Sequence, residues 1–261
     1  MKLIEIEQSL TGIGKPASVL LNGAIHGSNF AQENPVIVSD GQAIFDGDSK
    51  ITIPHGAGHI SVANSADGFL LGAHIAPDVL LAESPILYKQ GEYLFKINSS
   101  GKLAGYVYDG EGDYLGQVSA SVLPSAVEGN MRYYGMRYKI ATKTIELLSL
   151  AFGDTDFVIS SVDDNNGSFG TEGSTTNDLY MGYDGSNYLN GLGGGVNVFA
   201  DEYDLGVLIG YLNLHSDDIE NFTLWEYIWT TYGETFDPKL FATLKTSITD
   251  LSGYNPGMTG A

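Results

Sequence analysis

The segment Asp178–Ala200 constrains the fold more than any other part of the chain. Leu179 and Met181 form a short apolar run, a Tyr-Asp-Gly-Ser turn follows, and a second apolar run ends at Phe199. Apolar runs on either side of glycine and asparagine turn signals are typical of two strands joined by a tight connection. The segment therefore predicts a β fold.

The composition agrees with this prediction. A chain of 261 residues can bury roughly three quarters of its unfolded surface, so it needs no covalent cross-links. It contains no cysteine, which excludes disulfides, thiolate metal sites and cysteine nucleophiles. It has 34 glycines, more tyrosine (16) than phenylalanine (11), and only 17% charged residues. These numbers are typical of a turn-rich β protein with an uncharged polar surface.

The charge excludes two classes of partner. The chain carries 12 basic and 32 acidic side chains, a formal charge of -20. A field of that sign repels phosphate backbones and anionic headgroups, so we expect no nucleic acid partner. No window approaches a membrane span, and the first ten residues alternate instead of forming the apolar core of a signal peptide. We therefore expect no membrane insertion.

Five segments, in order between about residues 20 and 205, resemble the laminin-G-like domains of the concanavalin A-like lectin fold. They are an opening hairpin (Gln42–Asp48 with Lys50–Pro54), the strand Phe69–Pro77, the pair Pro85–Lys89 and Glu92–Ile97, the hairpin Arg132–Ile140 with Thr144–Leu150, and Asp178–Ala200. The chain departs from the pattern at His74, where the family has tryptophan, and at Tyr133-Tyr134, where it has a histidine pair. The resemblance implies a mainly β, two-sheet antiparallel jelly-roll sandwich.

The rest of the chain predicts two appendages. We expect a strand and linker over residues 1–16, the jelly roll over 17–212, and a small helical segment over 213–261. Met1–Glu7 alternates as a strand that either joins another subunit's sheet or folds back onto its own. Two C-terminal helices are predicted from residues at helical spacing: Phe222, Trp225, Trp229 and Tyr232 in the first, and Leu240, Leu244, Ile248 and Leu251 in the second, after the cap Asp237-Pro238. The tail from Gly253 is predicted to be turn-like.

A catalytic role is not expected. Lectin-fold glycoside hydrolases place two carboxylates on one strand so that they flank the scissile bond. The sequence has no such run, and its densest acidic cluster beside a strand (Asp201, Glu202 and Asp204) has the wrong order. We therefore predict that the protein is not an enzyme.

One turn carries the residue types that bind sugars. Glycan binding needs an aromatic ring for the apolar face of the sugar and amide or carboxylate groups for its hydroxyls. Tyr183, Asp184, Asn187 and Tyr188 supply both on one turn. In the alternative interpretation, the two tyrosines pack on the sheet and Asp184 only makes the turn.

Calcium is the one candidate cofactor. Asp163, Asp164 and Asn165 place hard oxygen ligands in a loop after the strand Phe157–Val162. Loops of this composition are also common as Asx turns, so the calcium site stays one of two interpretations.

Two functional classes fit such a domain: a non-catalytic glycan- or surface-binding module and a structural assembly protein. A sequence that starts at its own methionine without an export signal favours a virion surface protein made in the host cytoplasm. We expect a phage capsid decoration, head-fibre or tail component. Its expected partners are other virion subunits, further copies of itself, and host or environmental glycans. The alternative is a carbohydrate-binding adhesin module of a cellular surface protein, hence extracellular, and a glycoside hydrolase is the least favoured class.

Overall fold

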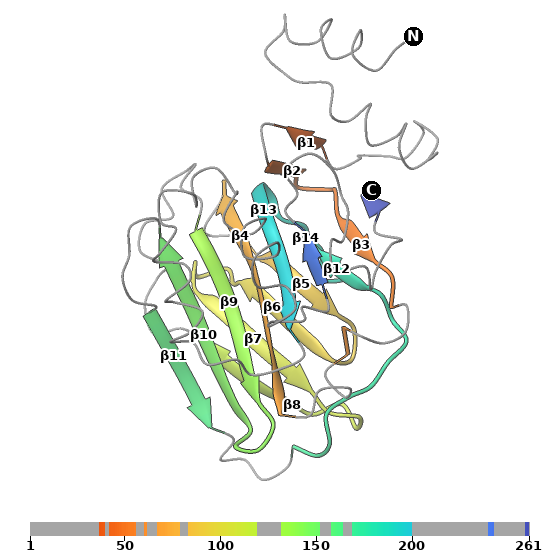
Figure 1. The fold of residues 1–261 in the computed structure, drawn as a ribbon, viewed down its shortest axis with the longest axis vertical. Coiled ribbons are helices and arrows are strands. Elements are labelled where there is room, and N and C mark those ends of the chain that lie inside the picture. The colour runs from red at the N-terminus through yellow and green to blue at the C-terminus, as the bar shows by residue number, and fades with distance from the viewer. Residues whose placement is uncertain are drawn as a thin grey trace, which may run out of the picture.

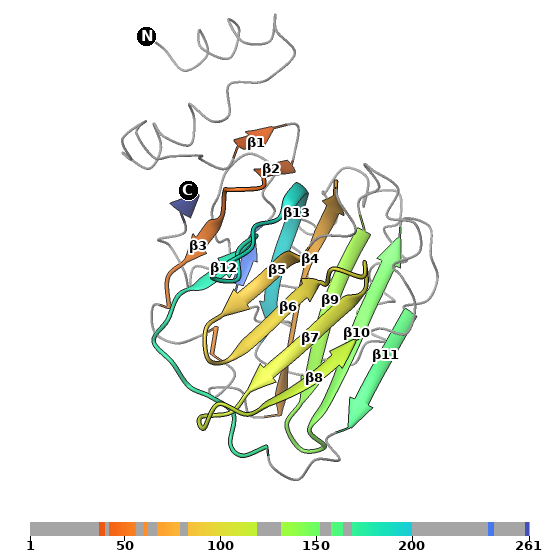
Figure 2. The ribbon, with the colours of Figure 1, turned by 180° about the vertical axis from the view of Figure 1, so that it is seen from behind.

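The protein is a sandwich of two antiparallel sheets that face each other across one apolar core (Figures 1 and 2). The computed structural model describes residues 37–39, 42–55, 60–61, 67–78, 83–118, 132–151, 158–163, 169–199, 240–242 and 259–260. The mainly β, two-sheet architecture expected from the sequence is confirmed. Within the described residues, no helix is long and apolar enough to cross a membrane.

The sheets have eight and seven strands. The order of the first is β1 (Ile37–Ser39), β2 (Gln42–Asp46), β13 (Asn190–Phe199), β4 (Gly68–Pro77), β9 (Arg132–Lys139), β10 (Thr144–Ala151) and β11 (Val158–Asp163), with β14 (Leu240–Ala242) also paired to β13. The order of the second is β15 (Thr259–Gly260), β3 (Ile51–Ile53), β12 (Leu179–Met181), β5 (Ser84–Lys89), β6 (Tyr93–Ile97), β7 (Leu103–Tyr108) and β8 (Tyr114–Val118).

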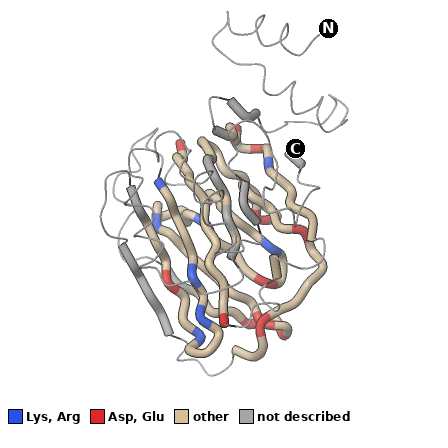
Figure 3. Tube along the Cα trace, viewed as in Figure 1, with Lys and Arg blue, Asp and Glu red and all other residues tan. Residues whose placement is uncertain are grey.

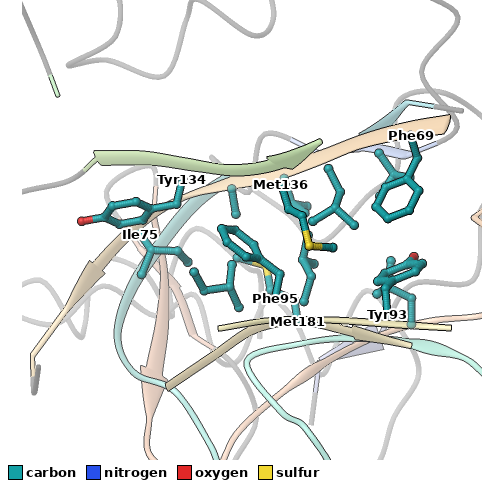
Figure 4. Close-up of a cluster of buried hydrophobic side chains, with 14 of the residues drawn as sticks. Phe69, Ile75, Tyr93, Phe95, Tyr134, Met136 and Met181 are labelled. Carbon is teal, nitrogen blue, oxygen red and sulfur yellow. The ribbon is translucent and has the colours of Figure 1, made fainter. Parts of the chain in front are cut away.

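The core forms because apolar residues alternate along the strands of both sheets. The predicted inward face of β4 is confirmed, since all four of its members are buried in the core: Phe69, Leu71, Ala73 and Ile75. Figure 4 shows Phe69, Ile75 and Met136 of the eight-stranded sheet opposite Phe95 and Met181 of the seven-stranded sheet. Each fully buried side chain of this size stabilises the fold by about 1.5–3 kcal/mol.

The predicted opening hairpin is wrong. β2 pairs with β1 and β13 in the eight-stranded sheet, whereas β3 pairs with β12 and β15 in the other sheet. The chain changes sheets at Gly47, which has a φ of 91° and donates its N–H to the carbonyl of Leu189 at 3.1 Å. The crossing lets Phe45 and Ile51 enter the core from opposite sides, which two neighbouring strands of one hairpin cannot do.

The second C-terminal helix is wrong at Leu240–Ala242, because these residues form β14. β2 pairs with β13 only over residues 190–193, and β14 pairs with residues 196–198 of the same strand. The backbone N–H and C=O groups of β13 beyond its pairing with β2 need hydrogen-bond partners, and residues 240–242 supply them as a strand, which the predicted helix could not do. The tail is also not purely turn-like, since Thr259–Gly260 pair with β3.

Several sequence predictions fall outside the described residues. They are the strand Met1–Glu7, the first C-terminal helix with Trp225 and Trp229, and the domain boundaries after residues 16 and 212. These stay predictions.

Candidate functional site

The turn between β12 and β13 is organised by the carboxylate of Asp184. Its Oδ1 accepts the N–H groups of Ser186 at 3.0 Å and Asn187 at 2.8 Å. The side-chain amide of Asn187 donates to both carboxylate oxygens, at 3.2 and 3.1 Å. Asp184 also donates its own N–H to the carbonyl of Asn187, at 3.2 Å. Asp184 therefore makes the turn, as the alternative interpretation of the sequence proposed.

The two tyrosines of this turn lie together. Tyr183 and Tyr188 are joined by an isolated β-bridge, and their ring centroids are 4.6 Å apart at an interplanar angle of 34°. Tyr180 meets the ring of Tyr183 edge-on, with centroids 5.7 Å apart. The ammonium of Lys50 lies 4.8 Å from the centroid of Tyr180 and 4.5 Å from that of Tyr183. The structure thus brings the predicted tyrosines together and adds two residues to them.

The alternation of side chains along the strands places the two added residues, Tyr180 and Lys50, beside the tyrosines of the turn. Leu179 and Met181 are fully buried in the core, so Tyr180 between them projects from the outer face of the seven-stranded sheet. Ile51 is likewise buried, which places the preceding Lys50 on the same outer face. Figure 2 shows this sheet in front, with the strands from β12 to β8 side by side.

More tyrosines continue across the same face. Tyr180 of β12 is directly opposite Tyr88 of β5, Tyr88 is opposite Leu94 of β6, and Leu94 is opposite Tyr106 of β7. We call Tyr180, Tyr88, Leu94 and Tyr106 the tyrosine row. The three tyrosines are half-buried, and Leu94 is 8% exposed. Strand pairing sets the row, because residues in register on one face become neighbours.

Two further tyrosines lie beside the far end of the row. Tyr114 of β8 meets Tyr106 edge-on with ring centroids 5.6 Å apart, and its ring is tilted against that of Tyr108 of β7 with centroids 6.0 Å apart. Tyr114 is 58% exposed. The ring of Tyr106 lies over Gly116, where an added Cβ would meet two of its carbons at 2.9 Å. Gly116 therefore leaves room for this ring position.

The tyrosine hydroxyls on this face share one environment. Burial, followed by the charge of Asp184 and the neighbouring Tyr183 and Tyr180, raises the pKa of Tyr88. Burial, followed by Tyr88, Tyr106, Tyr114 and Asp184, raises the pKa of Tyr108 to about 12. At neutral pH the hydroxyls of Tyr88 and Tyr108 are therefore protonated, and a protonated phenol can both donate and accept a hydrogen bond.

The sequence analysis did not identify this face. Its signal is nevertheless present, because tyrosines alternate with buried residues in Leu87-Tyr88-Lys89, Gly105-Tyr106-Val107-Tyr108 and Leu179-Tyr180-Met181. Each segment alone reads as an ordinary half-buried strand. The common face appears only when the order and register of the strands are known.

The calcium expectation is untested. Asp163 is the last residue of β11 and its backbone pairs with Thr144, while Asp164 and Asn165 lie outside the described residues. In the described ranges, no three His, Cys, Asp or Glu side chains form a group that could hold a metal ion. Asp201, Glu202 and Asp204 are also outside these ranges.

The most conspicuous acidic cluster lies at the turn between β7 and β8 (Figure 3). Its central member, Asp109, accepts the N–H groups of Glu111 at 2.9 Å and Asp113 at 2.8 Å through Oδ1. The other oxygen, Oδ2, accepts the N–H of Gly170 at 3.0 Å. These three backbone hydrogen bonds hold the pKa of Asp109 below its usual value, with that of Gly170 the largest influence. The carboxylate therefore organises two loops.

The fold is shared with proteins of known structure. No protein-family model and no curated protein matches the chain. A Bacteroides ovatus protein proposed to bind carbohydrate matches 84% of this chain and 59% of its own length, with 14% identity and a TM-score of 0.56.

Two toxin domains give similar values. The binding domain of Paraclostridial Mosquitocidal Protein 1 matches 72% of this chain and 48% of its own length, with 12% identity and a TM-score of 0.51. The Botulinum neurotoxin serotype G binding domain matches 71% and 46%, with 11% identity and a TM-score of 0.51. The chain spans less than two thirds of each of the three proteins. It is therefore similar in fold to a group of binding proteins.

Proposed function

We propose that the chain is a non-catalytic, lectin-like module that binds carbohydrate at the turn after β12. The observation that carries the proposal is the pair of tyrosine rings, Tyr183 and Tyr188, with Tyr180 and Lys50 beside them. Aromatic rings pack on the apolar faces of sugars, while tyrosine hydroxyls and an ammonium group hydrogen-bond to sugar hydroxyls. Asp184 acts here by shaping the turn.

The comparisons support a binding function over a catalytic one. The three structures described above are a protein proposed to bind carbohydrate and two toxin binding domains. At these identities the likeness concerns the fold, and function is carried by the site. The site offers aromatic rings and tyrosine hydroxyls, which are the groups of a binding surface.

The test is a glycan array followed by calorimetry with the best ligands. The wild type should bind at least one neutral glycan class. Tyr183→Ala should weaken binding by roughly fivefold or more, since the loss of one stacking ring corresponds to about 1 kcal/mol. Tyr183→Phe keeps the ring and should lose less, and Lys139→Ala, on β9 of the other sheet, should bind as the wild type does. An array without any bound glycan, or a Tyr183→Ala variant of unchanged affinity, would overturn the proposal.

The virion setting expected from the sequence is part of the same proposal. A sandwich that presents one glycan-binding face would serve a particle that attaches to cell surfaces. Antibodies against the protein should label intact particles and sediment with them. Labelling of a cell envelope without particles would instead favour the adhesin alternative.

A further inference from the structure

We propose that the binding face extends from the turn along the tyrosine row, and that its ligand is a neutral oligosaccharide lying across the strands. This inference rests on the proposed function and deepens it. It specifies a chain of several sugar units as the ligand and adds Tyr88, Tyr106 and Tyr114 to the contact residues.

The length of the row argues for an oligosaccharide. Tyr180, Tyr88 and Tyr106 occupy matched positions on β12, β5 and β7, with β6 between the last two. Neighbouring strands are about 4.8 Å apart, so these three strand steps cover roughly 14 Å. That distance exceeds one pyranose ring. Tyr114 on β8 extends the face by a further strand.

The side chains of the row suit a ligand with alternating apolar faces and hydroxyl edges. The three tyrosines are half-buried, so part of each ring remains accessible. Leu94 fills the position between Tyr88 and Tyr106 and adds an apolar floor. The raised pKa of Tyr88 follows from burial, as does that of Tyr108, so both hydroxyls stay neutral. A carbohydrate chain offers the complementary groups.

The charges argue for a neutral ligand. The chain as a whole carries -20, yet this face presents Lys50 and Lys96. Lys96 forms an ion pair with Glu83 at 2.6 Å, and Asp184 lies at the same end of the face as Lys50. These opposite charges offset one another, so the face attracts neither polyanions nor polycations. A neutral saccharide is the ligand class with matching charge.

The structure also separates the two parts of the face. Tyr106 lies over Gly116 and beside Tyr114, two strands away from Tyr88 and three away from Tyr180. A change at Tyr106 therefore leaves the turn with Tyr183 and Tyr188 intact. Binding of one sugar unit at the turn and binding of a longer chain can be measured separately.

The experiment is calorimetry with cello-, manno- and galacto-oligosaccharides from mono- to hexasaccharide on the full chain. For one series, wild-type affinity should rise by about tenfold or more with length, which corresponds to about 1.4 kcal/mol or more, because longer chains reach further rings of the row. Tyr106→Ala should lose most of this gain for chains long enough to reach β7, while the affinity of a monosaccharide bound at the turn should change little. Tyr106→Phe keeps the ring and is the matched control. Gly116→Val is a second variant in case Tyr106→Ala is unstable. Its side chain would clash with the Tyr106 ring and displace it, so it should affect binding in the same way as Tyr106→Ala.

The outcomes distinguish the two proposals. Affinity that is independent of length, or unchanged in both Tyr106→Ala and Gly116→Val, would overturn the extended face while the turn site stands. Length-dependent affinity that is lost in Tyr106→Ala but kept in Tyr183→Ala would support the row and refute the turn. Absence of binding in every series, together with a glycan array without any bound glycan, would refute both.

Discussion

Lys89 Nζ lies 3.1 Å from Glu92 Oε1, and both side chains are fully buried. The ammonium also donates to the backbone carbonyls of Thr175 and Asn177 and contacts Nδ1 of His55 at 3.2 Å. Glu92 in turn accepts the N–H of Thr175 at 2.9 Å. The pair therefore fastens the segment before β12 to the end of β5, next to Tyr88 of the tyrosine row.

Lys89→Met should lower the free energy of unfolding by about 3–5 kcal/mol, because it leaves the Glu92 carboxylate buried without its counter-charge. Urea denaturation measures this loss. The double variant Lys89→Met/Glu92→Met should be less destabilised than the sum of the two single variants. Additive losses would show that the two groups act independently.

Gly173→Ala should be destabilising by roughly 1–3 kcal/mol through overpacking. An added Cβ would lie 2.1 Å from the backbone oxygen of Gly91, which cannot move aside as a flexible side chain can. Gly170→Ala, in the same segment, is the matched control, since its Cβ would meet only Asp109 Oδ2 at 3.4 Å. Thermal unfolding should separate the two variants, and equal melting temperatures would contradict the close approach.

The free energy of unfolding should fall at alkaline pH because the buried hydroxyl of Tyr134 loses its proton. Burial raises the pKa of this hydroxyl to about 12, against an ordinary value of 10.0. The folded state therefore keeps its proton longer than the unfolded state does, and the stabilisation is complete below pH 10 and lost as the pH rises toward 12. Two pKa units correspond to roughly 2–3 kcal/mol.

Urea denaturation at about pH 9.5, below this window, and at about pH 11.5, near its upper end, tests the effect. Tyr134→Phe should lose less stability between them than the wild type. The burial of Tyr93 also raises its pKa well above the ordinary value, so some loss should remain in the variant. An identical loss in both proteins would exclude Tyr134 as its source.

Alternation along single strands made much of the fold predictable. The inward residues of β4 and the hairpin of β9 and β10 follow from local patterns, because the period of two is a property of one strand. The prediction of an opening hairpin was wrong because no local sequence pattern distinguishes a turn within one sheet from a crossing between two sheets. β14 was not predicted because it forms only by pairing with Val196 and Val198, which are far away in the sequence.

The candidate site was likewise predictable only where one short segment carries the residues. Tyr183 and Tyr188 were predictable as a pair because one short turn carries both. Tyr88 and Tyr106 were not, since only the pairing of three strands through Leu94 aligns them with Tyr180. Lys50 became a neighbour of Tyr183 through the crossing at Gly47, which the sequence did not predict.

The role of Asp184 can be separated from that of the rings it positions. Asp184→Ala removes the acceptor of two backbone N–H groups and of the Asn187 amide, so the turn should open and lose about 1–2 kcal/mol. Near-ultraviolet circular dichroism should change as Tyr183 and Tyr188 separate, and glycan affinity should fall with it. Ser186→Ala is the control, because Ser186 contributes its backbone N–H to the turn.

Asp184→Asn discriminates between shaping and direct contact. Its side-chain oxygen can still accept the N–H groups of Ser186 and Asn187, so the circular dichroism signal of the tyrosines should be largely kept. If Asp184 only shapes the turn, glycan affinity is kept as well. Loss of affinity with an unchanged tyrosine signal would mean that the carboxylate itself contacts the sugar hydroxyls. An unchanged signal in Asp184→Ala would instead mean that backbone contacts suffice, namely the bond from Leu189 N–H to the carbonyl of Gly182 at 2.9 Å and the bridge between Tyr183 and Tyr188.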